Sequence, residues 1–348
     1  MASALRLFGR EIRPGRIRSF QVEVSESYTG HPVRIPVTVV AGARPGPVCF
    51  VTAAVHGDEL NGVGAVRRLI SEAKALSLRL RGALVCLPLV NVLGFHVHSR
   101  YLPDRRDLNR EFPGNPDGPM AARVADAIWS KVIRRCHYGI DLHTAAQGQS
   151  NLPHVRADLK VPVLRRMAAA FGCELIYDDP GRRGSLRRTA TDQGIPSILL
   201  EAGGALEYDE EMIERGFRGC LAALGTLGML DEPPRPADFQ VTVRRADWIR
   251  AEGGGLIELK VHPGDLIRKG ELLYINSNPF GREVSRCLAP YTGLVFSTST
   301  IPMVRPGSPI CHIVPLSAGE AERARRARDA ARPHAAARGL RRRGRHGR

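Results

Sequence analysis

The sequence predicts an α/β domain followed by a smaller all-β domain. Between residues 17 and 204, apolar segments with strand character alternate with segments of helical periodicity, which is typical of a sheet covered by helices. After the stretch DEPPRPAD (231–238), the sequence changes to short strand-like runs separated by glycine turns, and its three prolines indicate a stiff linker. We therefore expect an α/β domain over 1–232, a linker over 233–238 and a β domain over 239–316.

The elements of the first domain follow from local patterns. Residues 17–55 contain three strand-like runs separated by Pro and Gly, and the first run alternates apolar and polar side chains. Residues 59–77 carry apolar side chains at helical spacing. The runs at 82–94 and 195–204 are predicted as buried strands because they are too apolar to face water. The remaining expected elements are a helix, a short strand and a helix at 119–136, 137–144 and 162–172.

Residues 95–118 are rich in Arg, Asp, Pro and Gly and contain no long apolar run. A loop of this length inside a compact domain is usually functional. The sequence therefore predicts that this loop contributes to a functional site.

The second domain contains a weak internal repeat. The stretch GLIELKVHPGDLIRKGELLYI from Gly255 is similar to GLVFSTSTIPMVRPGSPICHI from Gly293, and two such halves are expected to pack into a small β-sandwich or barrel. This domain resembles the barrel-sandwich hybrid domains of biotinyl and lipoyl carriers, which attach their cofactor to a Lys in an exposed hairpin turn. The comparable stretch here, SNPFGREVSRCLAP, has no Lys. We therefore expect a structural or substrate-covering module.

The charge of the chain is unevenly distributed. The 348 residues carry a net charge of +16, and the eleven Arg and three acidic residues of 317–348 supply half of it. This tail has little apolar content to bury, so we expect it to be disordered, apart from a possible short helix at 319–331. The remaining chain is only mildly basic, which argues against a dedicated nucleic-acid-binding protein.

Composition indicates a soluble cytoplasmic protein. Hydrophobic residues make up 43% of the chain, but no apolar run is long enough to span a bilayer and the N-terminus lacks the apolar segment of a secretory signal. The seven Cys are scattered and form no CxxC motif. Buried, reduced thiols are therefore expected rather than disulfides or a Cys-based metal site.

Four short motifs carry chemically active side chains at the ends of predicted elements. They are His56-Gly57-Asp58-Glu59, Asn109-Arg110, Asp141-Leu142-His143, and Glu201 before three small residues. A His and a Glu three residues apart can converge on one ion where the chain turns into a helix, and Gly57 eases that turn. Asp141 and His143 share one face of a strand, so Asp141 is suited to hold the imidazole of a metal-bound His143.

These residue types together suit a hydrolase. Two His and one Glu form the ligand set of a catalytic zinc ion, with one position left for water. Glu201 follows a buried strand and is placed to act as a general base, while Asn109 and Arg110 can grip a substrate carboxylate. Each motif also has a structural interpretation, such as a core histidine, a salt-bridge partner or a turn. Their joint occurrence at element ends favours the catalytic one.

The motifs HGDELNG, RYLPDRRDLNREFPG, DLHT and LLEAGG together resemble the succinylglutamate desuccinylase/aspartoacylase family, part of the wider zinc carboxypeptidase superfamily. The resemblance covers roughly residues 20–315 and includes the β domain. It implies a zinc-carboxypeptidase-like mixed sheet flanked by helices and one catalytic Zn²⁺ per chain. It also implies hydrolysis of the amide bond of a small, anionic N-acyl amino acid, which releases a carboxylate and an amine.

The resemblance also implies roles for individual residues. These are zinc ligation by His56, Glu59 and His143, carboxylate binding by Asn109 and Arg110, general acid/base catalysis by Glu201, polarisation of the scissile carbonyl by Arg100, and substrate contact by Tyr291. Separately, Arg187 and Arg188 shortly before Glu201 offer a second cation for a carboxylate, or else a solvated helix face.

Two other functions stay open from the sequence. The same zinc and carboxylate clamp would serve a metallocarboxypeptidase acting on short peptides or cell-wall fragments. In a different class, the Arg-rich tail would bind polyanions such as nucleic acid or anionic lipid without sequence specificity. The sequence identifies neither the acyl group nor the amino acid, and a homo-oligomer is possible.

Overall fold

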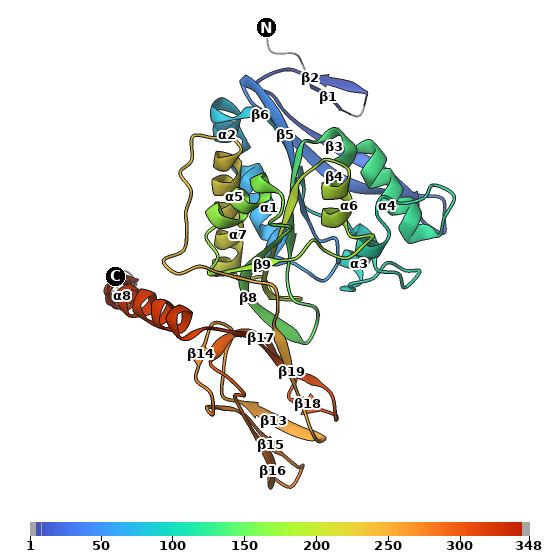
Figure 1. Cartoon of the computed structure of the whole chain (residues 1–348). Coiled ribbons are helices and arrows are strands. Elements are labelled where there is room, and N and C mark those ends of the chain that lie inside the picture. The colour runs from blue at the N-terminus through green and yellow to red at the C-terminus, as the bar shows by residue number, and fades with distance from the viewer. Residues whose placement is uncertain (1–4, 8, 343–348) are drawn as a thin grey trace, which may run out of the picture. The chain divides into compact units, whose positions relative to one another are not determined.

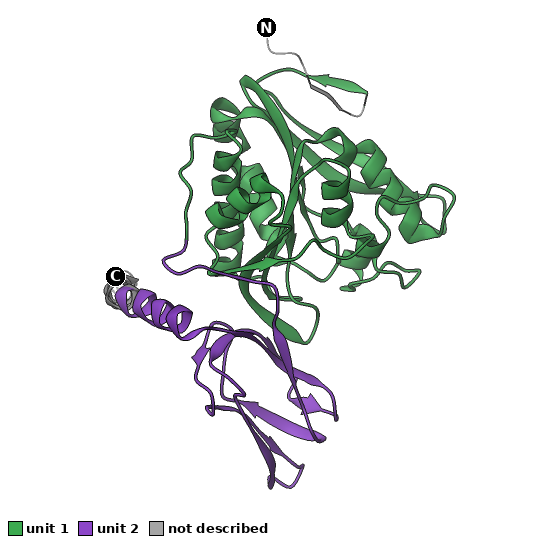
Figure 2. Ribbon diagram, in the orientation of Figure 1, with its two compact units in different colours: residues 1–236 green, residues 237–348 purple. Residues whose placement is uncertain are grey.

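The computed structural model describes residues 5–7 and 9–342 of the chain, which divides into two compact units (Figure 2). Unit 1 spans Met1–Pro236 and unit 2 spans Ala237–Arg348. The boundary falls within the proline-rich stretch 233–238. No helix in the described part of the chain is both long and apolar enough to cross a bilayer.

Unit 1 is built on a large mixed sheet with the strand order β9–β8–β10–β7–β5–β6–β4–β3. The central strands β6, β5, β7 and β10 run parallel. Strands β3 and β4 pair antiparallel to their neighbours, and β8 pairs antiparallel with β10 but parallel with β9. The strands are β3 (Ile17–Glu26), β4 (Pro32–Ala41), β5 (Arg44–Ala53), β6 (Arg81–Leu87), β7 (Tyr138–His143), β8 (Gln149–Ala157), β9 (Leu175–Asp178) and β10 (Ser197–Gly204). A separate hairpin is formed by β1 (Leu5–Leu7) and β2 (Arg10–Ile12).

Helices cover both faces of this sheet, as Figure 1 shows. On one face lie α1 (Asn61–Ser71), α2 (Ala73–Arg79), α5 (Pro162–Ala170) and α7 (Glu210–Thr226). On the other lie α3 (Val92–His96), α4 (Met120–Lys131) and α6 (Leu186–Asp192), with the short 3₁₀ turns η1 (Leu108–Arg110) and η2 (Ile133–Arg135) in the connecting segments. Each face has its own buried apolar core. The predicted α/β architecture, with a mixed sheet flanked by helices, is therefore confirmed.

The structure corrects several expected boundaries. The strand expected over 82–94 ends at Leu87, before a proline that cannot donate a ladder hydrogen bond. The chain then enters α3, whose first turn is capped by Asn91 Oδ1 accepting from the Gly94 amide. The helix expected over 59–77 is broken at Glu72, where the backbone leaves the helical region. The sequence patterns also missed β8, β9, α6 and α7.

Unit 2 contains two antiparallel sheets around an apolar core. One has the strand order β12–β19–β17–β14 and the other β16–β15–β13–β18. The strands are β12 (Asp247–Arg250), β13 (Gly255–Leu259), β14 (Leu266–Ile267), β15 (Leu272–Ser277), β16 (Glu283–Leu288), β17 (Gly293–Ser299), β18 (Met303–Val304) and β19 (Pro309–Pro315), preceded by β11 (Val241–Val243).

The two halves of the internal repeat form equivalent elements. The first half gives β13, β14 and β15, and the second gives β17, β18 and β19. Their pairing is reciprocal, because the short strand β14 pairs with β17 of the second half while β18 pairs with β13 of the first. The repeat seen in the sequence thus corresponds to two interlocked structural halves.

The C-terminal segment contains a helix where a short one was expected at 319–331, and this helix continues into residues that were expected to be disordered. Helix α8 spans Ala318–Arg342, and residues 343–348 lie outside the described part of the chain. Ala321 and Ala324 on its first turns are buried, and Arg328 donates a hydrogen bond to the carbonyl of Gly264. The sequence missed this anchoring because two small alanines and one Arg carry almost no hydrophobic signal.

Two truncated chains distinguish the part of α8 that stabilises the fold from the part that does not. Removing residues 331–348 should leave the melting temperature unchanged, because the buried alanines and Arg328 remain. Truncation after Leu316 should lower the melting temperature by about 4 °C or more, since it removes packing worth about 1–3 kcal/mol. Differential scanning calorimetry of both truncations checks this. Equal melting temperatures would contradict a packing role for α8.

None of the seven cysteines forms a disulfide, and six of them are buried. Burial raises the pKa of their thiols, for example that of Cys86 to about 12. The burial of these six thiols agrees with the expectation from the sequence.

Candidate active site

The structure brings His56, Glu59 and His143 together. His56 and Glu59 lie in the connection between β5 and α1, and His143 is the last residue of the adjacent parallel strand β7. One ligand atom from each of the three residues lies within 4.8 Å of the others. Glu59 Oε1 is 2.7 Å from His56 Nδ1 and Glu59 Oε2 is 2.7 Å from His143 Nδ1. All three side chains are buried.

Close packing explains the glycine in the first motif. A Cβ at Gly57 would lie 2.2 Å from backbone atoms of Gly94 and Phe95 in α3. Any side chain would therefore push α3 away from the loop that carries His56. Gly57 permits this close approach, and its φ is not in the left-handed region, so the expectation that it eases a turn is replaced by a packing reason.

A carboxylate holds the far side of each imidazole. Asp141 Oδ2 is 2.9 Å from His143 Nε2, and the Thr52 hydroxyl donates to Asp141 Oδ1 at 2.7 Å. Asp107 Oδ1 is likewise 3.0 Å from His56 Nε2. Because an ionised carboxylate only accepts hydrogen bonds, each Nε2 carries the proton and each Nδ1 keeps its lone pair for the centre of the cluster.

The donor set fits a divalent cation. Burial alone would raise the pKa of Glu59, but His56 and His143 outweigh it and hold that pKa well below its usual range. Burial would lower the pKa of His143, but Asp141 and Glu59 raise it well above its usual value. With neutral imidazoles, the carboxylates of Glu59, Asp107 and Asp141 leave a buried excess of negative charge that Arg100 only partly offsets. Two imidazole nitrogens and a carboxylate are ligands that Zn²⁺ prefers.

Glu201 lies directly beside this cluster. It stands on β10 in register with His143 of β7, so the two side chains leave neighbouring strands on the same face. The Nδ2 amide of Asn151 donates to its Oε2 at 3.4 Å. Burial raises the pKa of the Glu201 carboxyl, and His143 opposes that shift. A carboxyl with these surroundings suits proton transfer.

Arg100 also points to the cluster. Its guanidinium donates to Glu59 Oε1 at 3.1 Å and to Asp107 Oδ2 at 3.3 Å. Burial works to lower the pKa of Arg100, but the negative charges of Glu59, Asp107 and Glu201 raise it. The loop at 95–118 thus supplies a cation to the site.

The same loop places Asn109 and Arg110 at the edge of the site. Asn109 is buried, and its Oδ1 accepts from the backbone amide of Leu186 at the start of α6. Arg110 is exposed, its guanidinium donates to the Asn109 carbonyl at 2.5 Å, and it forms no ion pair with any described residue. Partial desolvation of its guanidinium lowers its pKa, the negative charge of Asp107 opposes this shift, and the positive charges of Arg182, Arg100 and Arg156 add to it.

Arg187 and Tyr291 are held elsewhere. The Arg187 side chain is 4% exposed, and its guanidinium donates to the carbonyl and the carboxylate of Asp179. Burial lowers its pKa to about 10. Tyr291 belongs to unit 2, where its hydroxyl donates to Asp247 Oδ2 at 2.9 Å. Neither side chain is free in the way that the sequence suggested.

Three polar residues near the site, Asp107, Asn151 and Arg156, were not predicted from the sequence. Asp107 stands two positions before Asn109 in the same motif. Its carboxylate could be recognised there, but the sequence did not show that its partner is His56. Asn151 and Arg156 lie on β8, which was not predicted. The alternation of polar and apolar residues in HVRA (154–157) was the available signal, and Pro153 obscured it.

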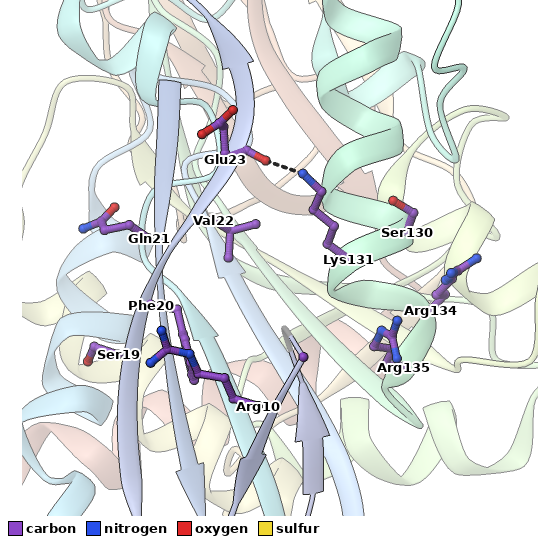
Figure 3. A pocket seen from close by; sticks show the side chains of 11 residues that line it. Arg10, Ser19, Phe20, Gln21, Val22, Glu23, Ser130, Lys131, Arg134 and Arg135 are labelled. Atoms are coloured by element: carbon purple, nitrogen blue, oxygen red, sulfur yellow. Dashed lines mark hydrogen bonds between the residues drawn. The ribbon is translucent and has the colours of Figure 1, made fainter. Parts of the chain in front are cut away.

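A separate cavity of about 700 Å³ lies between β3 and the end of α4 (Figure 3). Its lining includes Arg10, Lys131, Arg134 and Arg135 and none of the predicted site residues. Lys131 Nζ donates to the carbonyl of Glu23 at 2.7 Å. Cations at the C-terminal end of a helix complement its dipole, so the charge in this cavity has a structural explanation.

Comparison with known proteins identifies the family of this arrangement. The model of the succinylglutamate desuccinylase/aspartoacylase catalytic domain matches residues 45–227. An N-alpha-acetyl-L-2,4-diaminobutyric acid deacetylase of Halomonas elongata is 29% identical over 263 residues, which cover 69% of this chain and 73% of that protein.

Solved structures share the fold. A succinylglutamate desuccinylase/aspartoacylase from Rhodobacter sphaeroides is 26% identical, with a TM-score of 0.74 over 87% of this chain and 97% of that chain. The product-bound ectoine utilization protein EutE (DoeB) of Ruegeria pomeroyi is 22% identical, with a TM-score of 0.76 over 88% of this chain and 97% of that one. The chain therefore belongs to the succinylglutamate desuccinylase/aspartoacylase family, whose members are deacylases that hydrolyse amide bonds.

Proposed function

We propose that this protein is a zinc-dependent hydrolase that cleaves the amide bond of a small N-acyl amino acid. The observation that carries the proposal is the convergence of His56, Glu59 and His143 with Glu201 on the neighbouring strand. One acid/base group beside one metal centre is the minimum that amide hydrolysis by activated water requires.

His56 Nδ1, His143 Nδ1 and a carboxylate oxygen of Glu59 would hold the ion, while Asp107 and Asp141 orient the two imidazoles. When bound, zinc polarises the scissile carbonyl and lowers the pKa of water toward neutrality. Asp107 and Asp141 keep the rings in the tautomer that presents Nδ1 to the centre.

The loop residues bind and orient the substrate. Arg110 and the Nδ2 amide of Asn109 grip the α-carboxylate, because Asn109 Oδ1 is already engaged with the start of α6. Arg100 donates to the amide carbonyl oxygen, where negative charge develops as the carbon becomes tetrahedral. This holds the carbonyl carbon within reach of the attacking water.

Glu201 carries the proton. It removes a proton from the attacking water and then delivers it to the amide nitrogen, so that the C–N bond breaks. The water oxygen stays with the acyl group as a carboxylate, and the nitrogen leaves as the amine of the free amino acid. Partial burial and the raised pKa of Glu201 suit it to both steps.

The two units would have different roles in this reaction. We assign the catalytic role to residues 1–232 and a barrel-sandwich-like fold to 239–316. The two interlocked halves of unit 2 and the lack of a Lys in its hairpin 277–290 support a structural or substrate-covering module. We keep Tyr291 as a proposed substrate contact, although its hydroxyl donates to Asp247 Oδ2 in this structure.

Arg156 offers a second cation for the substrate. Its side chain is 36% exposed and shares the Asp179 carboxylate with the buried Arg187. The two guanidinium groups share this carboxylate, and Glu201 is a further negative charge near both of them. The Nε of Arg156 is buried and has no hydrogen-bond partner among the described residues, and such a donor gains from an anionic ligand. This favours Arg156, rather than Arg187, as the residue that binds an acidic side chain of the amino acid.

A substrate screen tests this function. Acetyl, succinyl and formyl derivatives of several amino acids should be hydrolysed, whereas short unblocked peptides should not. Within the acetyl series, N-acetylglutamate should exceed N-acetylglutamine in kcat/KM by about 10- to 100-fold, the worth of a hydrogen-bonded charge pair.

An Arg156→Gln variant should remove this preference, while Arg134→Gln, an exposed change in the separate cavity, should keep it. Release of amino acids from peptides but not from acylated derivatives would instead establish a carboxypeptidase. An unchanged preference in Arg156→Gln would contradict the role of Arg156 alone.

A further inference from the structure

The general acid/base that we propose has few constraints on its position. A glutamate side chain has three rotatable torsions, and a catalytic group must be held to within about 0.5 Å of its working position. Among the described residues, Asn151 is the one side chain that hydrogen-bonds to Glu201, through Nδ2 and Oε2 at 3.4 Å. The position of Asn151 therefore bears on the position of Glu201.

A β-bulge brings Asn151 to this place. Strands β8 and β10 pair regularly up to Glu201 opposite His154, but the next pair is Gly203 opposite Asn151. Between these two pairs, β8 therefore contains one more residue than β10. Without the extra residue, the alternation of the strand would direct the side chain at 151 to the opposite face of the sheet.

The bulge is held by its own contacts. The ring of the buried His154 lies with Nδ1 2.9 Å from the carbonyl of Leu152, so Nδ1–H donates to that oxygen. Pro153 stands in the bulge and has no amide to leave unpaired there. On β10, Gly203 has a φ of 73°, a left-handed conformation that glycine adopts without strain. Sequence and backbone on both strands therefore support the same local geometry.

We infer that Asn151 is a positioning residue for Glu201, turned onto the catalytic face by the bulge in β8. This inference rests on the proposed function. Asn151 Nδ2–H fixes one carboxylate oxygen, which leaves the other to exchange protons with water and the leaving nitrogen. Asn151 itself transfers no proton, so its effect passes entirely through Glu201.

The test compares two variants of Asn151. Asn151→Asp keeps the shape of the side chain but cannot donate when ionised and repels the Glu201 carboxylate, whereas Asn151→Ala removes the contact altogether. Both should lower kcat for N-acetyl amino acids about tenfold or more, with KM within twofold and zinc content unchanged. Gln149→Ala on the same strand is the matched control and should keep kcat. A wild-type kcat in Asn151→Asp, or a change in KM alone, would overturn the inference.

The background of Glu201→Gln separates this inference from the proposed function. In that background Asn151→Ala should cause no further loss, because residues that act as a unit are not additive. A further tenfold loss would show that Asn151 acts independently of Glu201 and would overturn the inference alone. Full activity of Glu201→Gln by itself would overturn the proposed function.

Discussion

A Glu201→Gln variant is expected to lose about 10²- to 10⁴-fold in kcat while it keeps its fold and its zinc. Glutamine matches glutamate in shape but cannot take a proton from water or return one to the leaving nitrogen. Glu201 is not among the three ligands, so metal binding should persist. The measurements are kcat and KM for an N-acetyl amino acid, together with zinc content by atomic emission.

The control for this variant is Glu211→Gln. Glu211 is exposed on α7 and forms an ion pair with Arg215 four residues later, so its loss should change kcat by less than about twofold. A Glu201→Gln variant with wild-type turnover would exclude Glu201 as the acid/base. Loss of both zinc and activity would indicate instead that Glu201 maintains the metal centre.

A His143→Ala variant is expected to lose both metal and activity. It removes one of three ligands from a buried cluster, and the carboxylates of Glu59 and Asp141 each lose one of their hydrogen-bond partners. Zinc should fall from about one per chain to a small fraction, and turnover should fall at least about a thousandfold, since the activated water is lost. Zinc content, melting temperature and kcat/KM measure these effects.

Asp141→Asn provides a graded comparison, because it keeps the ligand but weakens the hold on its ring. Loss of such a partner typically reduces metal affinity by about 10- to 100-fold. His96→Ala is the control, since His96 is exposed at the end of α3 and touches none of the three ligands. Unchanged zinc in His143→Ala, or equal loss in His96→Ala, would contradict the assignment of the centre.

Much of the site was visible in the sequence because each motif stands at the end of an element. The pairing of His56 with Glu59 needs only a local turn, and Asp141 with His143 needs only the alternation of a strand. That these two pairs meet follows from the adjacent parallel strands β5 and β7, whose carboxyl ends lie at one edge of the sheet. The predicted α/β class made this arrangement possible but did not specify it.

Other contacts depend on distant packing. The helical pattern around Arg187 could not show that its guanidinium is already paired, because its partner Asp179 lies in the preceding loop. Asp107 holds His56, from which it is separated by 51 residues, and no local pattern encodes that pairing. The anchoring of α8, though not the helix itself, was missed for a related reason, since it depends on two small alanines that are buried within unit 2.

The sequence by itself determined the α/β alternation, the repeat of the second unit and the identity of the side chains that carry the chemistry. These follow from short-range periodicity and from residue type. Only the tertiary structure decided which polar groups meet, including Asn151 on Glu201 and Arg156 on Asp179. The physical reason is that strand order and the bulge in β8 arise from long-range pairing, and one extra residue in a strand reverses the face to which every following side chain points.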